Sequence, residues 1–576
     1  MSTSPNKVSL SPQLSIESQP PKPGKVSSLL KRTKVVSSPE SANVSSLRSI
    51  LILIVLIQSL GGILTGCLGG NNRNSAELNL ILEHDLRTLD PALSTATNSG
   101  KLVALIFSNL VIYDKNGRIQ PKLAESWTIS KDGTTYTFNL KKNYKFSTGK
   151  NVTAKDFKYS IERVMEKTSK SPRKWVFDRL KGAKAFAKGE TKSITGISAP
   201  ENYKLILTLE KPFAPFLGFL SMPAAAVVDE EAVKKHGDSF GRNPVGSGPY
   251  KLKHWTMGSE IALERNPLAA NKPVLEKIVY KIINEPFTYS TEFKVGNLDM
   301  IPLPYSEVDF FSKHKVWQKS LKTQAGLNTY FIGMNCKKAP CNNVKVRQAI
   351  CHAIDANLIV NTTRKNQAVR AYGPIPPGIP GYSKDFKGME FSIEKAKALL
   401  KEAGYDKNLT LELLQDERNE NLEVTQIVVS SLAAAGIKVK IVPMEWGVYT
   451  SKINEGKFDL FYRSWLADYM DAENFLFPLF HSSQAGSSNR PKYSNTDVDK
   501  AIENAQATVN HEERMKLYRK IEERVVNDAA YSFLFHKLER IVTQPWVEKY
   551  ELKPVFNSYK FDKLSLNKEL LKKGVK

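Results

Sequence analysis

The chain has 576 residues, and its 83 Lys and Arg against 58 Asp and Glu give a formal net charge of +25 at pH 7. The basic residues are dispersed, with no arginine-rich run, helix-turn-helix pattern or zinc-finger spacing, which argues against nucleic-acid binding. A hydrophobic content of 41% suffices for a large core. The charge indicates a solvated basic surface, with attraction to anionic lipid or a cell-wall polymer as the alternative.

Residues 1–47 are rich in Ser and Pro, with scattered Lys and no periodic apolar pattern, so they are predicted to be disordered. Two interpretations of this extension remain open. It is either a real cytoplasmic tail or the product of a misassigned start. In the second case translation begins at Val44, and the signal sequence that follows has a normal length.

Residues 48–66 are predicted to be a lipoprotein signal peptide. Arg48 precedes an apolar run that is shorter than the ~20 residues needed to span a bilayer. A basic start, a short apolar stretch and small residues at the end are typical of secretory signals. The end, LTGC, resembles the bacterial lipobox, so Cys67 is expected to be lipidated and residues 67–75 to form a flexible tether. An uncleaved anchor with an incidental cysteine is the alternative.

About 500 residues follow Cys67, which allows two to four units at ~150 residues per domain. Their first half is predicted to be rich in strands. Thr153 is expected to cap a helix over 154–164. The last strand pattern reads as a hairpin that turns near Gly258. The strand segments lie within 76–93, 134–140, 201–213 and 246–267.

The second half alternates between strands and helices, which predicts an α/β lobe with a largely parallel sheet over 340–540. Ser392 is expected to cap a helix that ends at Gly404. Helices are predicted at 344–360, 392–404, 421–436, 448–456, 497–510 and 511–530, and strands at 409–415, 437–444, 458–465 and 531–535.

Seven stretches spread along the chain carry a further signal. The first is QPKLAESWTISKDG and its continuation, the third ends in VRQAICHAID, and the fifth contains FDLFYRSWLADYMD. In the same order, they resemble stretches of the family 5 extracellular solute-binding proteins, which are the peptide- and nickel-binding components of bacterial ABC importers. Together the resemblance covers about 76–545. The stretches are 120–157, 243–252, 334–355, 396–405, 456–475, 493–505 and 514–530.

The resemblance implies an α/β, two-lobed periplasmic binding protein fold of type II with an extra subdomain. Lobe I is expected to comprise 76–322 plus 540–576, and lobe II 323–539, with two crossovers between them. Such lobes close on a ligand, which stabilises the closed state through contacts to both. The expected function is capture of di- or oligopeptides and delivery to ABC permease subunits with a cytoplasmic ATPase. The protein is expected to be exported, lipid-anchored and monomeric, without a cofactor.

Other functions are compatible with parts of the sequence. Within the family, the solute could instead be a metal chelate, haem or an opine-like compound. From other classes, the chain could be a secreted hydrolase, or a binding fold kept as a scaffold or sensor. The eight histidines are scattered singly, without HxH or HExxH, and the sequence lacks GxSxG and a P-loop. No catalytic or metal-binding constellation is therefore predicted.

The W-x-x-D block, residues 465–469, carries the predicted ligand contacts. In peptide-binding relatives the Asp of this block pairs with the α-ammonium of the ligand, and the resemblance gives this role to Asp468. Trp465 and Tyr469 are expected to wall the cleft beside it. Arg463 is a candidate partner for a ligand carboxylate, or it neutralises a nearby Asp. Residue type alone would make Asp468 a helix cap or a surface side chain.

Two closely spaced cysteines, Cys336 and Cys341, are predicted to form a disulfide, because the chain is expected to enter an oxidising compartment. The closed loop is short, so the bridge would contribute only ~2 kcal/mol. Free thiols are the alternative. Cys351 lies among apolar residues of a predicted helix and is expected to be a buried, inert thiol.

Overall fold

The computed structural model describes residues 73–365, 367–405, 409–555 and 561–574. The N-terminal extension, the signal peptide and Cys67 lie outside the described residues, so their assignments stay predictions. The described residues belong to one unit, Gly70–Lys576. We keep the names lobe I for 76–322 plus 540–576 and lobe II for 323–539.

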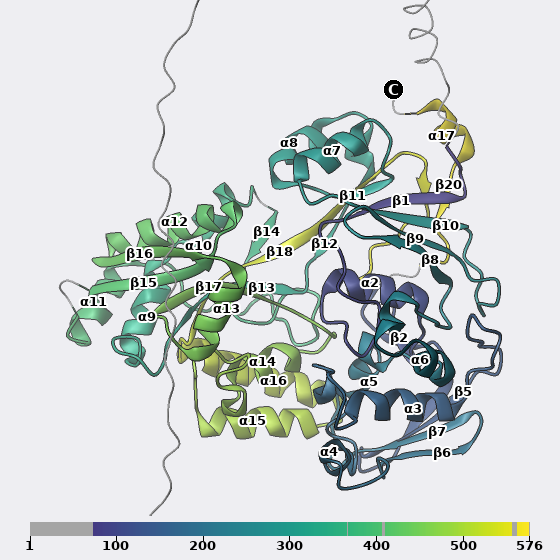
Figure 1. The fold of residues 1–576 in the computed structure, drawn as a ribbon. Helices are drawn as coiled ribbons and strands as arrows, with labels where there is room; N and C mark the ends of the chain where they lie inside the picture. Colours follow the sequence, from purple (N-terminus) through teal and green to yellow (C-terminus); the bar gives the residue numbers. More distant parts are fainter. Residues whose placement is uncertain (1–72, 366, 406–408, 556–560, 575–576) are drawn as a thin grey trace, which may run out of the picture. The chain divides into compact units, whose positions relative to one another are not determined.

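Lobe I contains two four-stranded sheets (Figure 1). In the first, only the β1–β10 pair is parallel. Gly258, at φ +70°, lies in the turn between β8 and β9, which confirms the predicted hairpin. The strands in spatial order are β1 (Glu77–Leu82), β10 (Lys277–Ile282), β9 (Glu260–Arg265) and β8 (Tyr250–Thr256).

The second sheet is antiparallel throughout and belongs to the extra subdomain. The helix α3 (Ala154–Met165) packs its buried side chains against this sheet, and it begins after Thr153 as predicted. The backbone N–H and hydroxyl of Thr153 both donate to Asp156 Oδ2, at 2.8 and 2.7 Å, which fixes this helix start. In spatial order the strands are β4 (Ala124–Ile129), β5 (Thr135–Leu140), β7 (Lys204–Thr208) and β6 (Ile197–Glu201).

The remaining elements of lobe I are short and connect or cover these sheets. The helices are α2 (Thr97–Ile106), α4 (Ala183–Lys188), α5 (Phe216–Phe219), α6 (Glu230–His236), α7 (Pro286–Lys294), α8 (Val308–Lys313) and α17 (Lys568–Lys573). The strand pairs are β2 (Val111–Tyr113) with β3 (Ile119–Pro121), and β19 (Val547–Glu548) with β20 (Ser565–Leu566).

The largest sheet has eight strands and is mixed rather than largely parallel. β15 pairs in parallel with β16 and β17, whereas β13 is antiparallel to both β17 and β18. Residue periodicity identifies a strand but carries no information about its direction, which explains the incorrect prediction. The strands are β11 (Met300–Pro302), β12 (Leu321–Ala325), β13 (Asn328–Met334), β14 (Ala368–Arg370), β15 (Leu409–Asp416), β16 (Ile437–Met444), β17 (Leu460–Leu466) and β18 (Tyr531–Thr543).

β18 links the two lobes. It has 13 residues, and its first part pairs with β13 of lobe II. Its last part pairs with β12 and β11, so the strand passes from lobe II into lobe I (Figure 1). The predicted crossings at 322/323 and 539/540 fall within β12 and β18, which pair with each other. Because β18 is shared by both lobes, the side chains in the middle of this strand lie between the lobes.

Helices cover both faces of the lobe II sheet. One face packs on α9 (Val344–Ala353), α10 (Ala356–Thr362), α11 (Ile393–Glu402) and α12 (Asn419–Ala434). The other packs on α13 (Trp446–Glu455), α14 (Glu473–Phe480), α15 (Thr496–Ala507) and α16 (His511–Asn527). α14 was not predicted from the sequence. The helix predicted at 344–360 is broken, because Asp355 Oδ1 accepts from Leu358 N–H at 2.9 Å and starts α10.

Candidate functional site

A cavity of about 420 Å³ lies where β18 passes between the lobes. Its volume is within the range of small-molecule sites. A ligand held here would touch both lobes, as a closing mechanism requires. The lining residues include Ile81, Thr97, Asn98, Lys101 and Tyr305 from lobe I, Leu327, Asn328, Gln367, Leu466 and Ala467 from lobe II, and 537–541 of β18.

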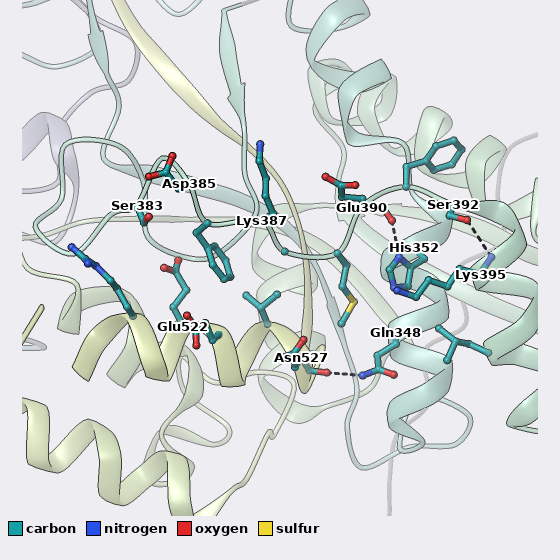
Figure 2. A pocket seen from close by; sticks show the side chains of 18 residues that line it. Gln348, His352, Ser383, Asp385, Lys387, Glu390, Ser392, Lys395, Glu522 and Asn527 are labelled. Carbon is teal, nitrogen blue, oxygen red and sulfur yellow. Dashed lines mark hydrogen bonds between the residues drawn. The ribbon is translucent and has the colours of Figure 1, made fainter. Parts of the chain in front are cut away.

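A second, larger groove of about 1040 Å³ lies entirely in lobe II (Figure 2). Its walls come from the segment 383–392, from α9 and α11, and from α16. Because none of its lining residues belongs to lobe I or to β18, a ligand in this groove would not bridge the lobes. The smaller cavity is therefore the candidate site for a ligand that closes them.

Leu466 and Ala467 line the two-lobe cavity, and Asp468, the next residue, follows them in the chain without lining it. Ala467, which lines the cavity, donates its N–H to the Leu327 carbonyl at 2.8 Å. The next residue, Asp468, donates its backbone N–H to Asn474 Oδ1 at 3.0 Å. These two hydrogen bonds hold the start of the loop, and with it the backbone of Asp468, in place.

The Asp468 carboxylate faces a guanidinium of lobe I. Arg173 Nη1 lies 3.4 Å from Asp468 Oδ2, and 11% and 24% of the two side chains are exposed. Arg173 is itself held by the carbonyls of Ser94 and Thr95, which accept from its Nε at 3.3 Å and its Nη2 at 3.2 Å. Asp468 Oδ1 accepts no hydrogen bond from the described residues. The carboxylate therefore joins the lobes and keeps one oxygen for a further donor.

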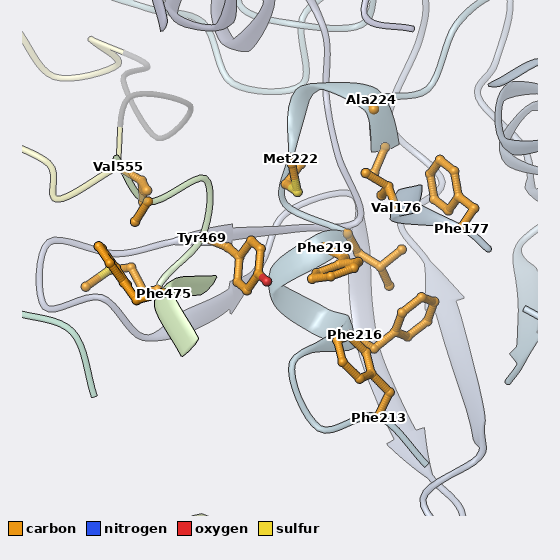
Figure 3. Close-up of a cluster of buried hydrophobic side chains, with 14 of the residues drawn as sticks. Val176, Phe177, Phe213, Phe216, Phe219, Met222, Ala224, Tyr469, Phe475 and Val555 are labelled. Carbon is orange, nitrogen blue, oxygen red and sulfur yellow. The ribbon is translucent and has the colours of Figure 1, made fainter. Parts of the chain in front are cut away.

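Tyr469 lies in an apolar contact between the lobes. Its ring centroid is 4.7 Å from that of Phe219, and only 2% of the residue is exposed (Figure 3). Its hydroxyl donates to the Glu473 carboxylate, and burial raises the pKa of Tyr469 well above its usual value. Phe213, Phe216 and Phe219 of lobe I share one buried cluster with Tyr469 and Phe475. Tyr469 thus packs the two lobes against each other.

Trp465 and Arg463 lie on β17 but do not line the two-lobe cavity. Trp465 Nε1–H donates to the Asn474 carbonyl at 2.7 Å and helps to fix the same loop. The Arg463 guanidinium carbon lies 4.8 Å from the centroid of the Trp446 ring on α13. Burial lowers the pKa of Arg463, and its Nη1 has no hydrogen-bond partner among the described residues.

The cavity has a charged and polar wall that the sequence analysis missed. Lys537 and Arg540 of β18 line it. Burial works against the charge of Lys537, but Tyr305 and Tyr330 nearby raise its pKa above the usual value, so it is charged at neutral pH. Arg540 Nε and Gln367 Nε2 are buried without a hydrogen-bond partner among the described residues. The only signal in the sequence was the charged run KLER within a strand pattern.

The predicted disulfide is not formed in the structure, in which Cys336, Cys341 and Cys351 are free thiols. Burial raises the pKa of Cys336 and raises that of Cys341 to about 12. Disulfide formation needs a thiolate, which this burial disfavours. Cys351 is also buried, and its pKa is raised to about 12, in agreement with an inert thiol.

The described part of the chain has neither a helix suited to span a membrane nor a metal-binding cluster. No helix there combines the length and the apolar character needed to cross a membrane. The same residues contain no group of three or more His, Cys, Asp or Glu side chains that could hold a metal ion.

A family model described as bacterial extracellular solute-binding proteins, family 5 middle, matches residues 118–487. The chain is 30% identical over 489 residues to the probable D,D-dipeptide-binding periplasmic protein DdpA of Escherichia coli K12, covering 82% of this chain and 90% of DdpA. It is also 30% identical over 471 residues to heme-binding protein A of Haemophilus influenzae, covering 78% and 85% of the two chains.

A solved structure of the ABC transporter-associated periplasmic binding protein DppA from Helicobacter pylori, in complex with the peptide STSA, matches with a TM-score of 0.74. The two are 29% identical, and the match covers 85% of this chain and 98% of DppA. These matches confirm the two-lobed type II fold with two crossovers that was expected from the sequence. The chain belongs to the bacterial extracellular solute-binding proteins of family 5.

Proposed function

We propose that the protein captures peptides between its two lobes and delivers them to the permease of an ABC importer. The observation that carries this proposal is the cavity of about 420 Å³, which both lobes and β18 line and whose lining residue Ala467 directly precedes Asp468. The names of DdpA and of the peptide-bound DppA structure support a peptide as the ligand. In this role the protein binds and releases its ligand without chemical turnover.

The ligand is proposed to lie with its α-ammonium at Asp468. One oxygen of that carboxylate is occupied by Arg173, and the other is open to a donor. An ammonium there would add a charge-assisted hydrogen bond to a carboxylate whose geometry is already fixed. Lobe closure would exclude part of the remaining water, which strengthens such a contact.

The opposite end of the ligand is proposed to meet the two basic residues of the β18 wall, which also carries Glu539. Lys537 and Arg540 line the cavity, and Arg540 Nε lacks a partner among the described residues. A ligand carboxylate would satisfy these donors. Arg463 stays a second candidate for this contact, because its Nη1 is also unpartnered, but its guanidinium stacks against α13 rather than lining the cavity.

The proposal extends to the location and state of the protein. Export to the periplasmic side of the membrane is supported by the relative DdpA, whose name describes it as periplasmic. Lipidation of Cys67, with residues 67–75 as the tether, would keep the protein near its permease subunits and their cytoplasmic ATPase. Two acyl chains suffice for stable anchoring. The protein is proposed to be a monomer. Its lobe I comprises 76–322 plus 540–576, and its lobe II comprises 323–539.

A non-peptide solute is the second candidate. Heme-binding protein A is as similar in sequence to this chain as DdpA is, so family membership alone does not select the ligand. The described residues that line the cavity include no His or Cys, which are common ligands of haem iron. The polar and charged lining instead suits a zwitterionic ligand such as a peptide.

Mass spectrometry of ligands that co-purify with the mature protein tests the choice directly. The protein is purified without denaturation, and the bound molecules are released with acid and identified. Short peptides are the expected result. Small-angle X-ray scattering before and after a peptide mixture is added should show compaction. A single non-peptide compound, or steady cleavage of peptides by the pure protein, would overturn the proposal.

A further inference from the structure

The larger groove in lobe II has the features of a binding site in its own right. It measures about 1040 Å³ and lies between the segment 383–392 and the helices α9, α11 and α16 (Figure 2). Apolar side chains form much of its surface, among them Phe386, Met389 and Val526. Because all its walls belong to lobe II, a ligand could occupy it whether the lobes are open or closed.

A buried carboxyl group lies in the wall of this groove. Glu522 on α16 is 3% exposed and lines the groove. Figure 2 shows its side chain rising from α16 toward the segment that carries Ser383 and Asp385. Within the described residues its only hydrogen bond comes from the Ile375 N–H, at 3.4 Å, and it forms no ion pair. A buried carboxyl with one long contact lacks the partners that such groups normally have.

Two further side chains that line the groove also present acceptors. His352 Nδ1 lies 2.6 Å from the Glu390 carbonyl, so Nδ1 carries the proton of the neutral ring and Nε2 is an acceptor. Burial lowers the pKa of His352, which favours this neutral form. Gln348 donates its Nε2–H to the Asn527 carbonyl at 2.9 Å, which leaves Oε1 as an acceptor. The inner surface of the groove therefore offers acceptors to a ligand that brings donors.

The charges at the groove are nearly balanced. Burial raises the pKa of Glu522 to about 8, and the adjacent Glu523 acts in the same direction. At neutral pH Glu522 is therefore mostly protonated, and it would ionise when a cation arrives. The other charged residues that line the groove are Asp385, Glu390, Glu523, Lys387, Lys395 and Arg519. With Glu522 ionised, four acidic residues face three basic ones.

We propose that this groove is a second binding site, which takes a small organic cation with an ammonium or guanidinium group on an apolar body. The cationic group pairs with the Glu522 carboxylate, and the body packs against Phe386, Met389 and Val526. When the cation binds to the protonated carboxylic acid, the acid proton leaves to solvent and a carboxylate–cation pair remains. The proton and charge balance is complete without any other reactant.

Binding of benzylguanidinium to the full mature protein tests this site, since that probe stays charged over the useful pH range. Calorimetry between pH 6 and pH 9 should show saturable binding. Affinity should rise roughly tenfold per pH unit below about 8 and then level off, because only the ionised fraction of Glu522 binds. Benzylurea, which is neutral and similar in shape, should bind at least tenfold more weakly at pH 8.

Two variants locate the site. Glu522→Gln resembles the protonated acid, so it should fold normally, lose at least tenfold in affinity for benzylguanidinium and lose the pH dependence. Glu512→Gln changes an exposed carboxylate at the start of the same helix, outside the groove lining, and should alter affinity by less than twofold. Asp468→Asn should leave binding of this probe unchanged, which separates the groove from the two-lobe cavity.

Three results would overturn the inference. They are the absence of saturable binding at millimolar probe, equal binding of benzylguanidinium and benzylurea, and unchanged affinity in Glu522→Gln that folds as the wild type does. None of them would bear on the peptide proposal, because that site uses other residues.

Discussion

Arg173 of lobe I and Asp468 of lobe II form an ion pair across the lobes, with Nη1 and Oδ2 3.4 Å apart. The two residues are 295 positions apart in the chain. Arg173 is fixed by two backbone carbonyls and Asp468 by the loop after β17, so each charge is positioned before they meet. Asp468, whose carboxylate is predicted to bind the ligand, therefore also makes a contact that favours closure of the lobes.

Replacing Arg173 with Gln should loosen closure in the absence of ligand. The pair is partly exposed, so the expected loss of closing free energy is at most ~1 kcal/mol. Small-angle scattering of the ligand-free protein should show a larger radius of gyration in Arg173→Gln. Lys174→Gln is the matched control, because Lys174 donates only to the Glu166 carbonyl within lobe I. Equal radii in the wild type and both variants would show that the pair does not hold the lobes.

Asp468→Asn should weaken peptide binding by removing the charge while keeping the shape. A desolvated charge pair that loses a partner costs ~2–5 kcal/mol. Because 24% of the Asp468 side chain is exposed and Arg173 shares its charge, we expect the lower end, roughly 30-fold in affinity. Calorimetry with free and N-acetylated peptides on both proteins measures the coupling. Additive losses would mean that the carboxylate and the ligand ammonium do not meet.

Cys67→Ser should release the protein from the membrane fraction or block its processing, because the lipid acceptor thiol is lost. Cell fractionation and N-terminal mass analysis of wild type and variant provide the measurement. Cys351→Ser, at a cysteine buried in lobe II, is the control and should stay anchored. If the Cys67 variant remains in the membrane with the N-terminus of the wild type, the apolar run is an uncleaved anchor.

Cys336 and Cys341 should be alkylated without reductant once the protein is unfolded. In the native state Cys341 should react slowly, since burial raises its pKa to about 12 and keeps it protonated. Peptide mapping under non-reducing conditions, with the exported protein as the sample, gives the result. A peptide cross-linked through these two cysteines would restore the disulfide predicted from the sequence.

Glu522→Gln should stabilise the protein at alkaline pH. The folded state raises the pKa of Glu522 from 4.5 to about 8, so the acid is protonated when folded and ionised when unfolded between these values. Below pH 4.5 Glu522 is protonated in both states and costs no stability. As pH rises from 4.5 toward 8, the unfolded chain gains stability by ionising this group, and the folded state loses the corresponding free energy of unfolding. Denaturant unfolding should show a stability gain for Gln that grows with pH to about 5 kcal/mol, since each pKa unit corresponds to ~1.4 kcal/mol. A gain that is independent of pH would contradict this.

Local signals allowed much of the secondary structure to be predicted. The start of α3 at Thr153 and Asp156, the hairpin turn at Gly258 and the start of α11 at Ser392 depend on residues within a few positions of each other. A sequence pattern contains all the information for such features. The resemblance of ordered stretches likewise predicted the family and the two-lobed fold correctly.

Contacts distant in sequence decided the rest. The antiparallel placement of β13 beside β17, the pairing of Arg173 with Asp468 and the burial of Glu522 each depend on segments more than 100 residues apart. The basic wall at Lys537 became part of a cavity only because β18 passes between the lobes. The sequence by itself determined the elements and the family, since these follow from local pattern. Tertiary structure decided which charges meet and which stay unpaired, because burial and pairing are properties of the packed chain.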